Sequence, residues 1–333
     1  MIKNNDKNCY FYGLGHCMVD FFVPNVDDLI FSKLKENSPL HLDKEEFSDF
    51  FSNFDIKIKK TGGTTVNILK TISRLGGKCF FSGSTGMERE YRDENALFFQ
   101  KEMARQGVEC QLFSRPDSTG RFLSIYNKNG EKAIAVNVGA AKQIEATQIN
   151  EIRFAHSSCF VMEGMQFLNQ EVLERVVDLA FRYNIPLAID CGTVFGAEAV
   201  AKRLWDISQS LDILLFANEG EVAALKQYVE KPQDCCLVYV EKFGAKGSKV
   251  YFDGEEFFQP AFEIENVKKS KNHAGNQIYI EDTGAGDTLV GSFLHSIFSS
   301  IDNSILELTF ETVKSSIEKA AKEATLVLDD FGV

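Results

Sequence analysis

The chain is poor in the residue patterns that build metal centres and disulfide frameworks. Its five histidines have no H-x-x-x-H or similar ligand spacing, and its eight cysteines are scattered without a C-x-x-C pair. Zinc sites require clustered donors, and disulfide frameworks are typical of short secreted chains rich in cysteine. We therefore expect reduced thiols, mostly in the core, and no zinc site.

Long apolar runs and excess positive charge are also missing. No window is apolar enough to span a bilayer, and the polar residues 1–8 lack the apolar stretch of a signal peptide. The formal net charge of −12 argues against binding nucleic acid through a general electrostatic field. These absences predict a cytoplasmic protein that binds small molecules and neither nucleic acid nor membranes.

The 333 residues, 44% of them hydrophobic, are enough for one large α/β domain or for a domain with an appendage. From Val108 onwards, apolar strand-like runs alternate with amphipathic helix-like segments, which is typical of a parallel sheet wrapped by helices. The clearest strand–helix–strand–helix unit comprises residues 185–190, 197–205, 211–216 and 219–228. Asp190 and Asn218 lie at the ends of its strands, where ligands collect in such sheets.

A different pattern occurs at residues 119–138. Two alternating runs, 121–126 and 132–136, flank an Asn129-Gly130 turn, which predicts a β-hairpin. Together with residues 21–23 and 56–59, this hairpin is expected to form a small sheet apart from the main one. The alternative is that these strands extend an edge of the main sheet.

Two further segments are polar. Residues 27–54 predict two short helices around Pro39, inserted before the next motif. Residues 266–276, rich in Lys, Asn, Ser and Gly, predict an exposed loop.

The most informative motif is Thr283-Gly284-Ala285-Gly286-Asp287-Thr288, which precedes a run of apolar and small residues. Two glycines and an alanine leave backbone amides bare where a helix begins, and such a turn holds a phosphate or a developing anion. The Asp287 carboxylate beside it is suited to accept a proton from a hydroxyl. The motif indicates phosphoryl transfer; an ordinary glycine turn capped by Asp287 is the alternative.

Three other segments suit a ligand site or a plain structural role. Gly62-Gly63-x-x-x-Asn67 opens a helix and lets backbone approach a ligand closely, or is a simple helix start. Asn218 and Glu221 either cap a helix or hold magnesium through water beside a phosphate. The turn at residues 242–247 either wraps phosphates or joins two strands of a hairpin. There is no Walker A sequence, and the Gly13-x-Gly15 fragment lacks the third glycine of a dinucleotide fingerprint.

Taken in order, these motifs resemble the PfkB family of carbohydrate and nucleoside kinases, which has the ribokinase-like fold. The resemblance implies a three-layer α/β/α sandwich with a mainly parallel central sheet and a small β-sheet lid. It implies a single domain over residues 1–333, with the lid built from about 17–24, 54–63 and 119–138. The insertion before Gly62 and the Phe216-Ala217-Asn218-Glu219 stretch are similar to the adenosine-kinase branch, which includes many bacterial sugar kinases.

The resemblance also implies roles for individual residues. It makes Asp287 the catalytic base that deprotonates a hydroxymethyl group as it attacks the γ-phosphate of ATP, while the amides of the turn stabilise the transferring charge. The residues of that turn are Gly284, Ala285 and Gly286. Candidate substrate-binding residues are Asp20, Gly62, Gly63 and Asn67. Arg121, on the lid, is a candidate for contact with the phosphates or the substrate, and an ordinary surface arginine is the alternative. Glu163 is a substrate candidate from its position at a strand end, where it either meets substrate or caps a turn. Candidate nucleotide-binding residues are Asn218, Glu221, Lys242, Gly244 and Gly247, of which Asn218 and Glu221 are expected to place Mg²⁺ through water.

The chain departs from the family pattern at three places. Glu281-Asp282 precede Thr283 where the family usually has Asp-Thr, a region that often shapes a monovalent-cation site, so potassium activation stays open. His16 replaces a frequent Asn, and Lys242 replaces a frequent Thr.

The substrate is left open by the sequence. The expected reaction is phosphorylation of a sugar or sugar-like alcohol; the alternatives are an adenosine kinase and, less favoured, an inactive nucleotide- or sugar-binding protein. A purine would need an apolar slot, for which Phe22, Phe160 and Met165 are candidates, although each also suits core or lid packing. A homodimer through the lid is a further possibility.

Overall fold

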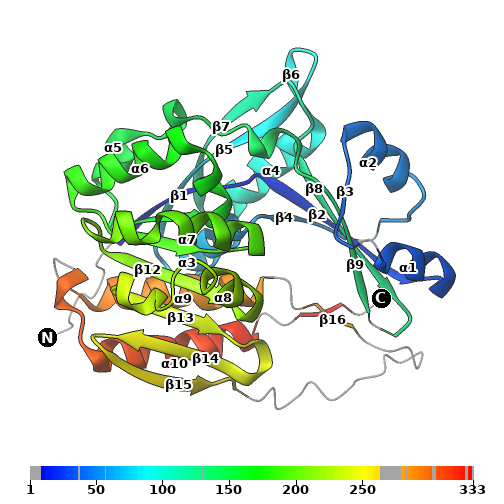
Figure 1. The fold of residues 1–333 in the computed structure, drawn as a ribbon. Helices are drawn as coiled ribbons and strands as arrows, with labels where there is room; N and C mark the ends of the chain where they lie inside the picture. The colour runs from blue at the N-terminus through cyan, green and yellow to red at the C-terminus, as the bar shows by residue number, and fades with distance from the viewer. Residues whose placement is uncertain are drawn as a thin grey trace, which may run out of the picture.

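A ten-stranded sheet runs through the centre of the molecule (Figure 1). The computed structural model describes residues 9–36, 38–56, 58–129, 131–262, 279–281, 284–301, 305–326 and 329–331. In the sheet, β13, β12, β11, β10, β1, β5 and β7 pair in parallel, and β14, β15 and β6 add antiparallel edges. The strands are β1 Tyr10–Leu14, β5 Lys78–Glu88, β6 Tyr91–Arg92, β7 Val108–Arg115, β10 Cys159–Glu163, β11 Leu187–Asp190, β12 Ile213–Asn218, β13 Val238–Lys242, β14 Gly247–Phe252 and β15 Glu255–Pro260.

Helices cover both faces of this sheet because its buried strands are apolar on both sides. Val161 and Ala188 belong to a core shared with α3 Thr64–Arg74, α4 Glu94–Arg105, α9 Ala285–Ser300 and α10 Phe310–Leu326. The next residues, Met162 and Ile189, belong to a second core shared with α5 Glu151–Ala155, α6 Gln170–Tyr183, α7 Val194–Ser208 and α8 Glu219–Leu225. The expected three-layer α/β/α architecture is confirmed.

A separate five-stranded sheet stands beside the main body, with strand order β3-β9-β8-β2-β4 (Figure 1). Its strands are β2 Met18–Val26, β3 Leu40–His41, β4 Ile58–Gly62, β8 Gly120–Asn127 and β9 Lys132–Asn137. β8 and β9 form the expected antiparallel hairpin. The strands therefore form their own sheet and do not extend the central one. Gly130 of the hairpin turn and Lys57 lie outside the described residues.

The insertion forms two helices, α1 Asp28–Lys35 and α2 Lys44–Phe51, on the outer side of the second sheet (Figure 1). This confirms the two helices expected around Pro39. α2 begins with a capping box between Asp43 and Glu46, and Phe47 is the residue of this helix whose side chain is fully buried. A small antiparallel pair, β16 Tyr279–Glu281 and β17 Asp329–Phe331, completes the described strands. The loop expected at 266–276 lies outside the described residues.

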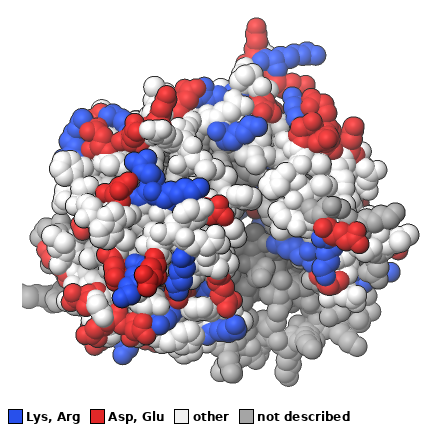
Figure 2. Space-filling view, viewed as in Figure 1, with Lys and Arg blue, Asp and Glu red and all other residues white. Residues whose placement is uncertain are grey.

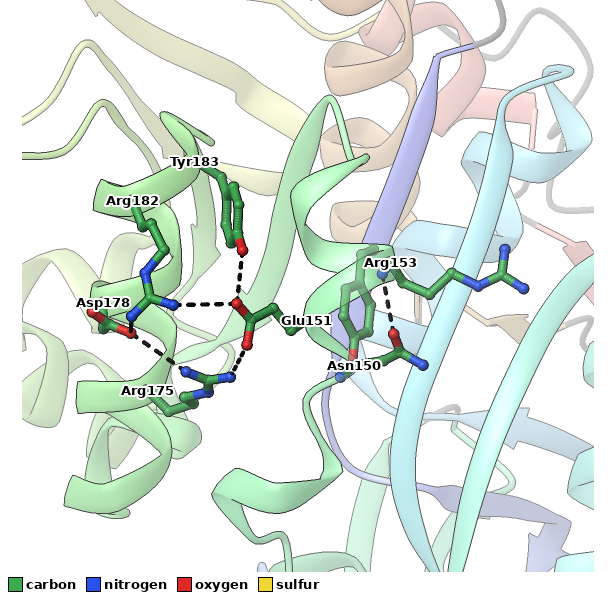
Figure 3. Close-up of polar contacts among 8 residues, drawn as sticks. Asn150, Glu151, Arg153, Arg175, Asp178, Arg182 and Tyr183 are labelled. Carbon is green, nitrogen blue, oxygen red and sulfur yellow. Dashed lines mark hydrogen bonds and ion pairs between the residues drawn. The ribbon is translucent and has the colours of Figure 1, made fainter.

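The surface carries charges of both signs. Acidic and basic side chains are interspersed on the face drawn in Figure 2, without a large basic area. A charge network joins α5 to α6, where Glu151 accepts hydrogen bonds from Arg175, Arg182 and Tyr183 (Figure 3). Within the described part of the chain, no helix is both long and apolar enough to cross a membrane.

Candidate active site

Four neighbouring parallel strands end in polar residues that project to the same face of the sheet. The residue two positions earlier in each strand belongs to the core beneath α3 and α9, and side chains two apart in a strand share a face. In register, Glu163 of β10 pairs with Asp190 of β11, and Asn218 of β12 pairs with Lys242 of β13. The carboxyl edge of the sheet therefore presents two acids, an amide and an ammonium group towards α9.

Helix α9 begins directly above this row. Gly284 is its N-cap, with a φ of 91°, and no side chain caps the first turn. A Cβ atom placed on Gly284 would lie 3.7 Å from Asn67 Nδ2, and one on Gly286 would lie 3.8 Å from Lys242 Nζ. The turn is therefore flanked by two donors, and its own backbone amides add the positive end of the helix dipole.

Asp287 lies in the first turn of α9 and accepts a hydrogen bond of 2.8 Å from Asn67 Nδ2. Burial is the main cause that raises the pKa of Asp287 to about 7, and the negative charge of Asp190 adds to it. Lys242 and the Asn67 hydrogen bond oppose this rise. A carboxylate with a pKa near neutrality is well matched to accept a proton at physiological pH.

Lys70 is a site residue that sequence reasoning missed. Its Nζ atom donates to Asn67 Oδ1 at 3.1 Å and to the Thr61 carbonyl at 3.0 Å. By occupying the oxygen of the Asn67 amide, Lys70 orients the amide nitrogen towards Asp287. Burial lowers the pKa of Lys70, while the carboxylates of Asp20 and Asp287 oppose that shift. The sequence signal that could have identified Lys70 is its position three residues after Asn67, which puts both side chains on the same face of α3.

Asp20 reaches the site from β2 of the second sheet. It is buried, and a Cβ atom on Gly62 would lie 2.1 Å from its carboxylate oxygens. Gly63 has a φ of 105°, and a Cβ atom there would lie 2.4 Å from the His16 carbonyl oxygen. Both glycines are therefore required sterically, one by the Asp20 side chain and the other by the backbone of the preceding loop.

His16 and Glu163 form a buried pair at the end of β10. Glu163 Oε1 accepts from the His16 backbone amide at 2.8 Å, lies 2.9 Å from His16 Nδ1, and accepts from Gln166 at 3.2 Å. Burial disfavours the imidazolium, but the Glu163 carboxylate outweighs it and raises the pKa of His16. His16, which replaces the Asn that is frequent in the family, therefore has a specific acidic partner in Glu163.

At the end of β12, Asn218 and Glu221 form a reciprocal capping box at the start of α8. The Asn218 side chain accepts from the Glu221 amide at 3.0 Å, and Glu221 accepts from the Asn218 backbone at 2.8 Å and from its side-chain amide at 2.8 Å. Burial and the nearby Asp190 raise the pKa of Glu221. Both residues therefore have the helix-cap role, one of the two roles expected from the sequence.

The turn after β13 joins it to the antiparallel strand β14. Gly244 and Gly247 both have positive φ, 54° and 124°. A Cβ atom on Gly247 would lie 2.2 Å from the Gln259 carbonyl, whereas one on Gly244 would meet nothing within 4 Å. Gly247 is needed for packing against β15, and Gly244 leaves open space next to it.

The structure brings most of the candidate residues together, with one exception. Arg121 donates to Ser48 Oγ and to the Lys44 carbonyl, both at 3.1 Å, and its guanidinium lies 4.4 Å from the centre of the Phe47 ring. These contacts fasten α2 to the second sheet and give no support to the expected substrate contact. Asp190, which the sequence placed at a strand end where ligands collect but gave no role, is buried beside Lys242 in this row.

The chain belongs to the pfkB family of carbohydrate kinases, which it matches over residues 58–333. It is therefore a phosphotransferase that acts on a hydroxyl group of a small molecule and uses ATP. Probable fructokinase-5 of Arabidopsis thaliana is 22% identical over 269 residues, which cover 75% of this chain and 76% of that protein.

Solved structures with the same fold include both sugar and nucleoside kinases. A probable sugar kinase from Rhizobium etli CFN 42 superposes with a TM-score of 0.79 at 17% identity, covering 97% of this chain and 94% of the other. Adenosine kinase from Sinorhizobium meliloti gives 0.76 at 17% identity, with 97% and 95% covered. These likenesses establish the ribokinase-like fold.

Proposed function

We propose that the protein transfers the γ-phosphate of ATP to a hydroxymethyl group of a sugar or sugar-like substrate, with Asp287 as the general base. The observation that carries this proposal is the position of Asp287. It lies in the first turn of α9, has a pKa of about 7, and is held by Asn67 beside the glycine turn.

In the proposed step, the substrate hydroxyl gives its proton to the Asp287 carboxylate while its oxygen forms a bond to the γ-phosphorus. The bond between that phosphorus and the bridging oxygen of ADP breaks, and ADP leaves with the electron pair. The bare amides of residues 284–286 are placed to stabilise the negative charge on the transferring group.

Magnesium fits the acidic side of this site through water. Asp190 and Glu221 are both buried, and the pKa of Glu221 is raised first by burial and then by the negative charge of Asp190, which a divalent cation would offset. Among the described residues, no group of three or more acidic, histidine or cysteine side chains is arranged to hold a metal ion directly. Mg²⁺ commonly keeps several waters and binds phosphates with one or two carboxylates, which suits Asn218 and Glu221 as water-mediated partners. When bound, it would neutralise phosphate charge.

We further propose that the second sheet acts as a lid. Asp20 on β2 and Gly62 at the end of β4 belong to that sheet and also lie at the substrate side of the site. Closure of this sheet over a bound substrate would exclude water, which otherwise competes as a phosphoryl acceptor. The homodimer through the lid stays a prediction and potassium activation stays an open question, and Asp282 and Thr283 lie outside the described residues.

A pocket beside His16 supports a carbohydrate over a nucleoside, because no Phe, Tyr or Trp is among the described residues that line it. Its volume is about 820 Å³, and its lining combines polar with aliphatic side chains. Two of the candidates for a purine slot lie elsewhere: Phe160 is buried against Tyr12 and Phe154, and Phe22 is 5% exposed within the second sheet. Met165 does line the pocket, together with Lys142, Gln166 and Asn169.

The test is an ADP-release assay of the purified chain with ATP, Mg²⁺ and a panel of free sugars, sugar acids, polyols and adenosine. We expect turnover with a carbohydrate, and a loss of about 1,000-fold or more in kcat for Asp287→Asn, because a positioned base contributes about 10²–10⁴-fold. Asp178→Asn, on the surface of α6, is the control. Full activity of Asp287→Asn would show that the base is another residue, and turnover of adenosine alone would replace the carbohydrate assignment.

A further inference from the structure

Lys242 places a full positive charge in the nucleotide half of the site. Its side chain is 13% exposed, and its ammonium lies 2.5 Å from Oδ2 of Asp190, whose side chain is almost completely buried. A Cβ atom on Gly286 would lie 3.8 Å from Lys242 Nζ. The ammonium is thus held between the end of β11 and the first turn of α9.

The surroundings keep this lysine charged. Burial by itself would lower the pKa of Lys242, but the carboxylates of Asp190, Glu221 and Asp287 outweigh it and raise that pKa above its ordinary value. Three acids thus face one ammonium group from three different elements: β11, α8 and α9. A neutral donor at the same position would leave these acids without a compensating cation.

We propose that Lys242 is a catalytic residue that contacts the transferring phosphoryl group, with Asp190 as the positioning residue that aims its ammonium at the glycine turn of α9. The location of that phosphoryl group rests on the function proposed above. The helix terminus supplies only about half an elementary charge, whereas a transferring phosphoryl group spreads negative charge over three oxygens. Lys242 adds a whole charge at the place where the turn amides converge.

A simpler role competes with this one. Lys242 sits at a position where a buried carboxylate needs a partner, and removing one member of a buried ion pair is destabilising whatever the chemistry. The two roles differ in what they predict for nucleotides. A contact to the transferring group acts on the γ-phosphate and is absent with ADP, whereas charge balance with Asp190 is indifferent to the nucleotide.

The experiment compares Lys242→Met, the double variant Asp190→Asn/Lys242→Met, and the control Lys226→Met. Lys226 lies 3.2 Å from Glu241, a buried glutamate one residue before Lys242 that packs on the opposite face of the same strand. The Lys226→Met control therefore also removes a lysine that pairs with a buried acid, but this pair lies away from the site. Thermal stability, kcat, KM and calorimetric binding of ADP and of a non-hydrolysable ATP analogue are measured for each.

We expect Lys242→Met to lower kcat by about 100-fold or more, as for the loss of one stabilising group in other enzymes. The same variant should weaken the binding of the ATP analogue at least 10-fold more than the binding of ADP, with little change in KM for the acceptor. The double variant, which removes both members of the Asp190–Lys242 pair, should regain stability but not kcat. The proposal would be overturned if kcat recovered in the double variant, or if the binding of ADP and of the ATP analogue weakened equally. Lys242 would then serve only to balance the charge of Asp190.

The outcome is separable from that of the proposed function. If the native chain turns over no acceptor, the kinase proposal fails, but the difference between ADP and the ATP analogue still decides the role of Lys242. If the native chain is an active kinase and Lys242→Met behaves like Lys226→Met, only the inference about Lys242 fails.

Discussion

The side-chain amide of Asn67 donates a 2.8 Å hydrogen bond to the Asp287 carboxylate, joining residues 220 positions apart in the chain. The bond links the start of α3 to the start of α9, two helices packed on the same face of the central sheet. It also acts on the chemistry, because a donor to a carboxylate stabilises the ionised form and lowers its pKa.

Replacing Asn67 by leucine should move the pH dependence of the reaction. Without the donor, the pKa of Asp287 should rise above about 7, by about one unit for a hydrogen bond to a charged group. The base must be deprotonated to act, so the acidic limb of the kcat/KM profile should shift to higher pH. The profile is measured from pH 5.5 to 9, with the exposed Asn53→Ala as control. If the acidic limb of the profile did not move, a group other than Asp287 would determine it.

Replacing Asp287 by asparagine should stabilise the fold at alkaline pH. The folded-state pKa of Asp287 is raised from 3.8 to about 7, so the folded protein favours the protonated form. Its stabilising contribution is complete below about pH 4 and is lost as pH rises towards 7. The gain in Tm of Asp287→Asn over the native chain should therefore grow between these pH values and then level off. Equal Tm values for Asp287→Asn and the native chain at pH 8 would show that burial of the ionised Asp287 does not destabilise the fold.

Replacing Gly62 by alanine should weaken substrate binding selectively. The added Cβ would fall 2.1 Å from the Asp20 carboxylate, so Asp20 must move away from its position. A hydrogen bond to a charged group contributes about 1.5–3 kcal/mol, which corresponds to a rise in KM for the acceptor of about 10- to 100-fold. Calorimetry should give an unchanged affinity for ADP. A matching rise in KM for Asp20→Asn would support the same cause, and an unaltered KM in both would remove Asp20 from the substrate site.

Replacing Arg121 by methionine should affect stability and leave catalysis intact. The variant loses two hydrogen bonds to α2 and the contact with the Phe47 ring, at a cost of about 1–3 kcal/mol in the free energy of unfolding. Limited proteolysis should cut residues 28–54 faster, with kcat and KM within about two-fold of the native values. A rise in KM at unchanged stability would instead restore the substrate contact expected from the sequence.

Sequence patterns were sufficient for the parts of the site that local spacing encodes. The glycine turn before Asp287 and the Gly62-Gly63-x-x-x-Asn67 helix start are local, and the Asn218–Glu221 spacing is that of a capping box. The alternation of strands and helices likewise gave the layer architecture, because the apolar periodicity of each element is set by its own residues.

Contacts that depend on register and docking could not be predicted in the same way. Asp190 and Lys242 are 52 residues apart and meet across β12, where the register places Lys242 two residues beyond the level of Asp190. Arg121 was correctly placed on a hairpin, but its partner depends on where the inserted α2 packs. Lys70 carried a readable signal at helical spacing from Asn67, yet only the fold shows that Asp20 lies near it.

The row of polar strand ends limits how this chain can change in length. Successive side chains of a strand point to opposite faces, so inserting or deleting one residue within β11 would turn Asp190 from the layer of α9 to the layer of α7. The same applies to Glu163, Asn218 and Lys242 in their strands. Insertions are therefore tolerated in the connections beyond the opposite edge of the sheet, while the strands β10 to β13 must keep their residue count for the four side chains to converge.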